Sequence, residues 1–163
     1  MRVRHSILVL LATVALAGSA HAATGFSTNM NGSAEVPPNA STATGSSTCV
    51  LNDAGTQLTV FVQFQNLSAN YSASHIHGFS APGVNSGVRF GFTPTLSNGN
   101  RNGVFNGTWN LTATDVTNMI AGLCYVNIHT TAFPGGEIRG QLAVDNAVSN
   151  TPSTWGRLKK LYR

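Results

Sequence analysis

The residues best placed to do chemistry are three histidines in two strand-like stretches. His75 and His77 flank Ile76 in the first stretch, and His129 follows Ile128 in the second. Alternate side chains of a strand point to the same face, so His75 and His77 project together while Ile76 points away. If the apolar side chains face the core, the three imidazoles can converge on the polar side. Because neutral imidazole is the commonest metal ligand among side chains, this spacing predicts a site for one metal ion.

The donor set indicates which ion this site would take. Three neutral nitrogens without a thiolate or carboxylate favour copper or zinc over calcium or magnesium, which prefer oxygen. Copper leads in the order of affinities, so copper is the expected ion and zinc the second choice, with a fourth coordination position left open. The alternative is that the histidines are structural and bond through their ring nitrogens to backbone carbonyls in turns.

Three further polar residues are candidates to surround the ligands. Asn127 shares the strand face of His129, and Glu137 and Arg139 are two positions apart in a later strand-like stretch. Glu137 would accept a proton from a ligand imidazole, and Arg139 would attract an anion to the open position. The alternative for this pair is an exposed ion pair that contributes little stability. No nucleophile and base occur at the spacing of a hydrolase motif, so we assign no catalytic residue.

The chain has two cysteines, Cys49 and Cys124. We expect them to form a disulfide, because the N-terminal sequence described below directs the chain to an oxidising compartment. Ligation of a metal by the thiolates is the alternative. Cys124 is two and four positions before Val126 and Ile128, so its side chain would point to the same apolar face as theirs. This favours the structural role.

Alternation of apolar and polar residues runs through most of the chain and predicts strands. The predicted strands cover about 26–30, 48–51, 58–64, 73–78, 88–92, 104–111, 123–130 and 137–144. Short strands at this spacing are typical of an all-β sandwich or barrel, here of about seven or eight antiparallel strands.

One segment departs from this period and predicts a short helix. Thr112 and Asp115 form a capping box in which Asp replaces the usual Glu, apolar residues recur at helical spacing over 116–120, and Gly122 is placed to end the helix.

Four motifs give the chain a resemblance to a known family. They are Glu35-Val36-Pro37-Pro38, His75-Ile76-His77-Gly78, Tyr125-Val126-Asn127-Ile128-His129-Thr130 and Pro134-Gly135-Gly136-Glu137-Ile138-Arg139-Gly140. In this order they resemble the CHRD domain, the module first named from chordin, over roughly residues 26–142.

The resemblance implies a Greek-key β-sandwich similar to copper/zinc superoxide dismutase, whose copper site also uses a His-x-His pair and a later histidine. The present chain departs from that enzyme, which needs four copper histidines and further zinc ligands in a long loop. Residues 79–103 contain no His, Asp, Glu or Cys. The zinc site of the enzyme is therefore not expected.

The two ends of the chain differ in composition from the middle. Residues 1–22 have a basic start, an apolar stretch and Ala20-His21-Ala22, which together predict a signal peptide and export to the periplasm or beyond. Residues 23–145 form the predicted domain, and 146–163 a polar linker with a basic tail that could touch a membrane surface weakly. No later stretch is long enough to predict a transmembrane segment.

Charge excludes one class of partner for the predicted domain. Between residues 23 and 145 there are three basic residues against five acidic residues, a net charge of −2. Such a balance provides no basic patch for nucleic acid.

The leading hypothesis is an exported protein that binds one copper ion for storage, delivery or redox protection. The second is an extracellular or periplasmic module that binds another protein and has structural histidines. The third is a metalloenzyme similar to superoxide dismutase, for which an open coordination position would allow some chemistry.

Overall fold

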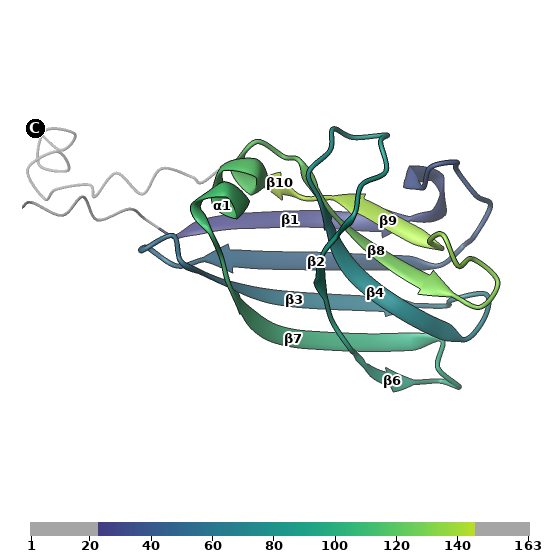
Figure 1. The fold of residues 1–163 in the computed structure, drawn as a ribbon. Coiled ribbons are helices and arrows are strands. Elements are labelled where there is room, and N and C mark those ends of the chain that lie inside the picture. The colour runs from purple at the N-terminus through teal and green to yellow at the C-terminus, as the bar shows by residue number, and fades with distance from the viewer. Residues whose placement is uncertain (1–22, 146–163) are drawn as a thin grey trace, which may run out of the picture.

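Ten strands form one antiparallel sheet that curls into a half-barrel in the computed structural model, which describes residues 23–145 (Figure 1). The strands are β1 Thr24–Asn31, β2 Thr44–Leu51, β3 Gln57–Gln65, β4 Tyr71–Gly78, β5 Val88–Gly91, β6 Thr95–Ser97, β7 Asn102–Asn110, β8 Cys124–Thr130, β9 Ile138–Gln141 and β10 Ala143–Val144. Their order in the sheet is β5-β4-β8-β9-β1-β2-β3-β7-β6, and β10 pairs with β1. The predicted all-β class is confirmed.

The sheet has more strands than the alternation pattern predicted. β6 is a short additional strand, and the predicted strand at 137–144 is divided into β9 and β10. β9 pairs with β8 on one side and with the end of β1 on the other, whereas β10 pairs with the first half of β1.

The apolar side chains of both halves of the sheet meet inside the curl. β3 alternates strictly between exposed and buried residues, and its Leu58, Val60 and Val62 have no exposed surface. Val126 and Ile128 of β8 meet the same core from the other half of the sheet. Burial of these side chains removes apolar surface from water and stabilises the fold.

The outer face of β8 is buried as well, so every residue of this strand is inaccessible. A covering loop, residues 79–87, lies over that face. Arg139 of β9 holds the loop, because its Nη1 donates to Asn85 Oδ1 at 3.0 Å and its Nη2 donates to the Val84 carbonyl at 2.9 Å. Asn85 Nδ2 in turn donates to the Val36 carbonyl at 2.9 Å, which ties the loop to the segment after β1.

The predicted helix is present as α1, Ala113–Ile120. The Thr112 hydroxyl accepts from the Asp115 backbone N–H, and the Asp115 carboxylate accepts from the Thr112 N–H, so the capping box is complete. Gly122 follows the helix with φ of 71°, a value that favours glycine. Asp115 also forms an ion pair with Arg89 of β5, which joins the helix to the edge of the sheet.

The predicted disulfide between Cys49 and Cys124 is not formed, and both residues are buried free thiols. Cys49 lies on β2 and Cys124 on β8, and strands β9 and β1 separate these two strands in the sheet. Burial raises the pKa of Cys49 to about 11 and that of Cys124 to about 12, so both thiols stay protonated at neutral pH. Their place in the apolar core agrees with the predicted parity of Cys124.

Among residues 23–145, no helix has the length and apolar character needed to cross a membrane. The predicted signal peptide at 1–22 and the predicted linker and basic tail at 146–163 lie outside the described residues.

Candidate metal centre

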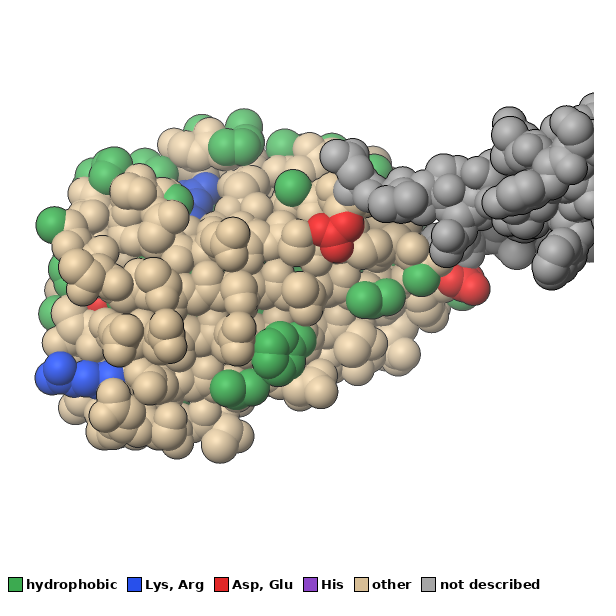
Figure 2. All heavy atoms as spheres, turned by 180° about the vertical axis from the view of Figure 1, so that it is seen from behind, with side chains coloured by type: hydrophobic (Ala, Val, Ile, Leu, Met, Phe, Trp, Pro, Cys, Tyr) green, Lys and Arg blue, Asp and Glu red, His purple; other side chains and the backbone are tan. Residues whose placement is uncertain are grey.

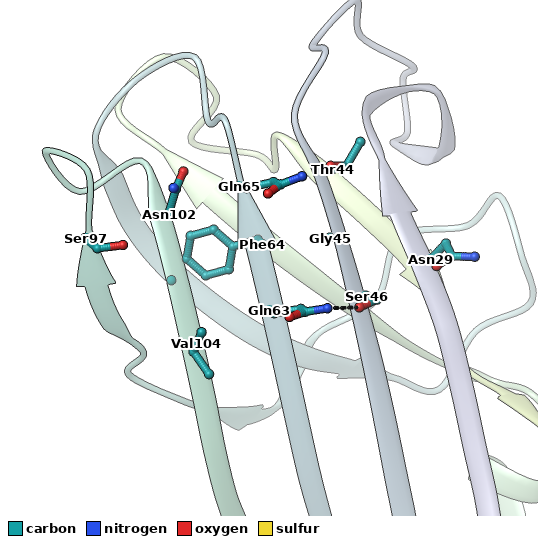
Figure 3. Close-up of a pocket in the computed structure, with 11 residues that line it drawn as sticks. Asn29, Thr44, Gly45, Ser46, Gln63, Phe64, Gln65, Ser97, Asn102 and Val104 are labelled. Atoms are coloured by element: carbon teal, nitrogen blue, oxygen red, sulfur yellow. Dashed lines mark hydrogen bonds between the residues drawn. The ribbon is translucent and has the colours of Figure 1, made fainter.

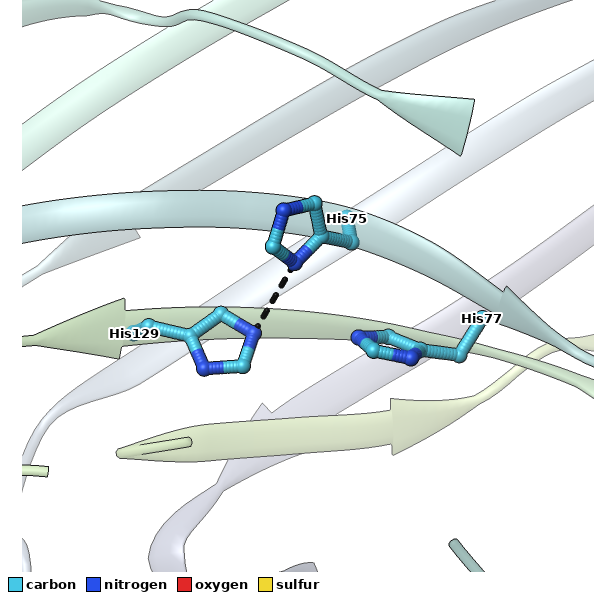
Figure 4. A group of neighbouring side chains, drawn as sticks. All are labelled: His75, His77 and His129. Carbon is cyan, nitrogen blue, oxygen red and sulfur yellow. Dashed lines mark hydrogen bonds between the residues drawn. The ribbon is translucent and has the colours of Figure 1, made fainter. Parts of the chain in front are cut away.

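The three histidines lie together on the outer face of neighbouring strands. His75 and His77 are on β4, and His129 on β8 is opposite Ala73 in the register of the pair. One ring nitrogen of each residue can be chosen such that all three atoms lie within 4.8 Å of one another. Figure 4 shows the three rings turned toward a common point, with His75 Nδ1 3.1 Å from His129 Nε2. This is the arrangement that the strand parity predicted.

Two backbone carbonyls determine which nitrogens carry protons. His77 Nδ1 lies 2.9 Å from the Ser86 carbonyl, and His129 Nδ1 lies 2.9 Å from the Pro134 carbonyl. Because a carbonyl oxygen can only accept, each Nδ1 must donate, and each neutral ring then has its lone pair on Nε2. The Nε2 of His77 is buried and has no hydrogen-bond partner. The structure thus provides a buried nitrogen lone pair that faces the other two rings.

The environment keeps these imidazoles neutral. Burial lowers the pKa of His75, with a smaller effect of His77, and burial likewise lowers that of His77, with a smaller effect of Arg139. The pKa of His129 is lowered to about 4, chiefly by burial. Neutral imidazole is the form that binds metal. Because His129 has its lone pair on Nε2, His75 Nδ1 donates to it in this structure, so the His75 proton would have to move to Nε2 before the three nitrogens could share an ion.

Tyr125 is a residue of the site that the sequence reasoning did not identify. Its ring stacks on that of His77, with centroids 4.8 Å apart and planes at 3°. The Tyr125 hydroxyl accepts from the Ser86 N–H at 3.1 Å, so the same side chain also holds the covering loop. The sequence did contain a sign of this role, because the two-residue period of a strand places Tyr125 on the same face as Asn127 and His129.

Arg139 lies beside the site but is engaged with the covering loop. Besides its bonds to Asn85 and Val84, its guanidinium lies 3.4 Å from the centre of the Tyr125 ring. Arg139 therefore orders the loop and the ring that stacks on His77, which differs from the expected role of attracting an anion.

Glu137 is buried away from the imidazoles. Its carboxylate accepts from the Ser68 backbone N–H, the Ser41 hydroxyl and the Thr130 hydroxyl, each at 2.7 Å. The imidazole protons go to the Ser86 and Pro134 carbonyls instead. Glu137 forms no ion pair with Arg139, because it precedes β9 and faces the loop segments around residues 41 and 68.

Asn127 is placed between His75 and Arg139 in the strand register, as expected for a residue that surrounds the ligands. Its Oδ1 is buried without a partner, and so is Oε1 of Glu35. A Cβ atom at Gly136 would lie 2.5 Å from Asn127 Oδ1 and 2.6 Å from Glu35 Oε1, so only glycine fits there. Glu35 is the second residue that sequence reasoning did not place near the site, although it begins one of the four motifs of the family resemblance.

The geometry can hold one metal ion among three imidazole nitrogens. Within residues 23–145 this is the one group of three or more His, Cys, Asp or Glu side chains close enough to share an ion. Two of its rings have fixed orientation and a known lone pair, and no carboxylate or thiolate belongs to the group. Such a donor set suits copper or zinc.

Comparison with known proteins gives one result. The family model described as the CHRD domain matches residues 26–142. No curated protein and no solved structure matches the chain.

Proposed function

The chain belongs to the CHRD domain family, and we propose that it binds one copper ion through His75, His77 and His129, with zinc as the alternative ion. The proposed purpose is storage, delivery or redox protection in an exported protein.

The observation that carries the proposal is the unpartnered Nε2 of His77. A buried acceptor without a hydrogen bond costs about 1–3 kcal/mol, and this cost needs a compensating interaction. The position of His75 Nδ1 and His129 Nε2, 3.1 Å apart and beside His77, supports a metal ion as the compensating partner. A purely structural His77 would be expected to have a hydrogen-bond partner at its buried Nε2 as well as at Nδ1.

The chain's own residues would hold and protect such an ion. The Ser86 and Pro134 carbonyls fix the ring orientations, which reduces the entropy lost on binding. When bound, copper supplies one-electron redox and Lewis-acid chemistry. The covering loop limits access of water and reductants to the buried side of the site, a property that suits retention of an ion better than rapid turnover.

The test is the metal content of the full chain, expressed with its own N-terminus and purified without a chelator or histidine tag. We expect about one copper per chain by mass spectrometry. Electron paramagnetic resonance should show Cu(II) with hyperfine coupling to imidazole nitrogen. The H75A/H77A/H129A variant should contain no stoichiometric metal, and the H77A variant should lose it while keeping the circular dichroism of a β protein.

Two results would count against the proposal. Protein that contains no metal and retains neither copper nor zinc after dialysis would indicate structural histidines. An H77A variant that unfolds, together with wild type that never holds metal, would favour the protein-binding module instead. A control variant at an exposed position away from the site, Q57A, should behave as wild type in both measurements.

A further inference from the structure

The outer face of strands β1, β2, β3 and β7, which we name the neutral face, is polar, and the strands themselves contribute no charged side chain to it. None of the residues in these four strands is Lys, Arg, Asp or Glu. Its outward side chains are mostly amides and hydroxyls. Figure 2 shows this face, with an acidic side chain inside its outline. The Asp145 carboxylate, from beyond β10, accepts from the Ser27 hydroxyl of β1. Exposed charge is the usual means of keeping a surface soluble, so its absence over four strands needs an explanation.

Three exposed apolar side chains cross the neutral face in a diagonal line. In the register, Val50 is opposite Thr59, Phe61 is opposite Thr48 and Asn106, and Val104 is opposite Gln63. Val50, Phe61 and Val104 are therefore diagonal neighbours, with exposures of 49%, 38% and 46%. Hydrophobic side chains in such a line are visible in Figure 2. The face thus has a narrow apolar ridge between polar margins.

A groove of about 500 Å³ lies at one end of this ridge (Figure 3). Its walls include Asn29, Thr44, Gln63, Gln65 and Asn102. Within this groove Gln63 Nε2 donates to the Ser46 hydroxyl at 3.1 Å, and Asn102 Oδ1 accepts from the Asn66 N–H at 2.9 Å.

The remaining groove side chains have unused hydrogen-bonding capacity. The side chains of Asn29, Thr44 and Gln65 form no hydrogen bond within the part of the chain that the structure describes. Amides and hydroxyls both donate and accept, so these side chains can serve a ligand that does the same. The volume is within the range of small-molecule sites.

These observations identify the chemistry of the ligand. Each sugar unit of a polysaccharide has hydroxyls that donate and accept and an apolar C–H face that packs on an aromatic ring. The neutral face offers the complement, with Phe61 as the exposed ring and Gln63 and Gln65 as hydrogen-bonding groups. We propose that the neutral face binds an uncharged polysaccharide chain along the ridge and groove.

The charge of the face argues against other occupants. Nucleic acid, anionic lipid and acidic polysaccharide all require basic side chains, and the four strands have none. A second copy of the chain would bury three isolated apolar side chains among many polar groups, which would have to lose water without defined partners. A polysaccharide supplies those partners directly.

The test measures retention of the purified full chain on polysaccharides. The neutral set is cellulose, chitin, β-1,3-glucan, mannan, amylose and agarose, and the charged set is alginate and heparin. We expect retention on at least one neutral polymer and on neither charged polymer. Affinity should fall at least tenfold in F61A and in Q63A. The control I120A removes an equally exposed apolar side chain on α1, away from the neutral face, and should bind as wild type.

Each other outcome overturns the proposal. These are no retention on any neutral polymer, retention that F61A and Q63A leave unchanged, and retention on charged polymers only. Self-association that F61A abolishes, seen by light scattering without retention on any polymer, would assign the face to a second copy. Phe61 and Gln63 are exposed, so both variants should fold, and circular dichroism checks this. The H75A/H77A/H129A variant should bind as wild type, which separates this proposal from that of the metal site.

Discussion

Glu35 is a buried carboxyl whose environment makes a specific prediction about pH. Its pKa is raised to about 7, and burial is the largest cause. The charge of Arg139 and a hydrogen bond from Asn127 act in the opposite direction and have smaller effects on this pKa. In the unfolded chain the carboxyl ionises near its ordinary pKa of about 4.5. The folded state therefore binds the proton more tightly. Its contribution to stability is fully present below pH 4.5 and is lost as the pH rises through 7.

Replacement of Glu35 by Gln should remove this pH dependence, because the amide resembles the protonated carboxyl. We expect E35Q and wild type to have similar free energies of unfolding at pH 4.5. At pH 8 the variant should be the more stable by on the order of 3 kcal/mol. Urea denaturation in the presence of a chelator, at both pH values, measures this difference. A difference that does not change with pH would contradict the assigned pKa.

At the scale of single residues, the candidate metal ligands were predictable and their hydrogen-bond partners were not. The parity of His75, His77 and His129 follows from the two-residue period of a strand. The acceptors of their protons are the Ser86 and Pro134 carbonyls, and backbone groups leave no signal in residue type. Glu137 was expected in that role because its side chain is a good acceptor, but three other donors occupy it.

Helix α1 is a local element whose stability should depend on its cap. The Thr112 hydroxyl accepts from the Asp115 N–H, one of the donors that the first turn of a helix leaves without a partner. We expect T112A to lower the free energy of unfolding by about 1 kcal/mol, the usual cost of losing an N-cap side chain. Chemical denaturation followed by fluorescence measures it.

The matched control for this prediction is T112S, which keeps the hydroxyl. T112S should remain within about 0.5 kcal/mol of wild type, since Ser and Thr are both good N-caps. Equal losses in the two variants would show that packing of the Thr112 methyl group, rather than the cap, matters. Metal content should be unaffected in both, because α1 supplies no residue of the histidine site.

Most elements were predictable because their signals are local. The alternation in β3 and the capping box of α1 are properties of a few consecutive residues, and both have their expected structure. The stretch at 137–144 was predicted as one strand, but β9 lies between β8 and the end of β1, whereas β10 pairs with the first half of β1. Partner choice depends on residues far away in sequence, so alternation does not reveal it.

At the scale of the whole molecule, metal binding should stabilise the fold. A ligand that binds only the folded state adds about 2.7 kcal/mol at a free concentration of 100 times its Kd. For a domain of this size we expect copper to raise the Tm by on the order of 10 °C over metal-free protein. Differential scanning calorimetry with and without copper measures the shift.

The H75A/H77A/H129A variant is the control for this shift. Its Tm should not respond to copper, because the chain then lacks the three nitrogens that the folded state brings together. An equal rise in the variant would place the bound copper elsewhere on the chain. No rise in wild type would contradict the proposed site.

The sequence by itself determined the all-β class, the capped helix, the family and the common strand face of the three histidines. The class, the helix and the common face follow from residue type and from a period of two or of 3.6 along the chain. The family follows from the four motifs and their order. Only the tertiary structure decided that the polar face is buried, that the Ser86 and Pro134 carbonyls hold the protons of His77 and His129, and that Cys49 and Cys124 are separate thiols. These features depend on which strands become neighbours and on what covers them, and such contacts form between residues far apart in the chain.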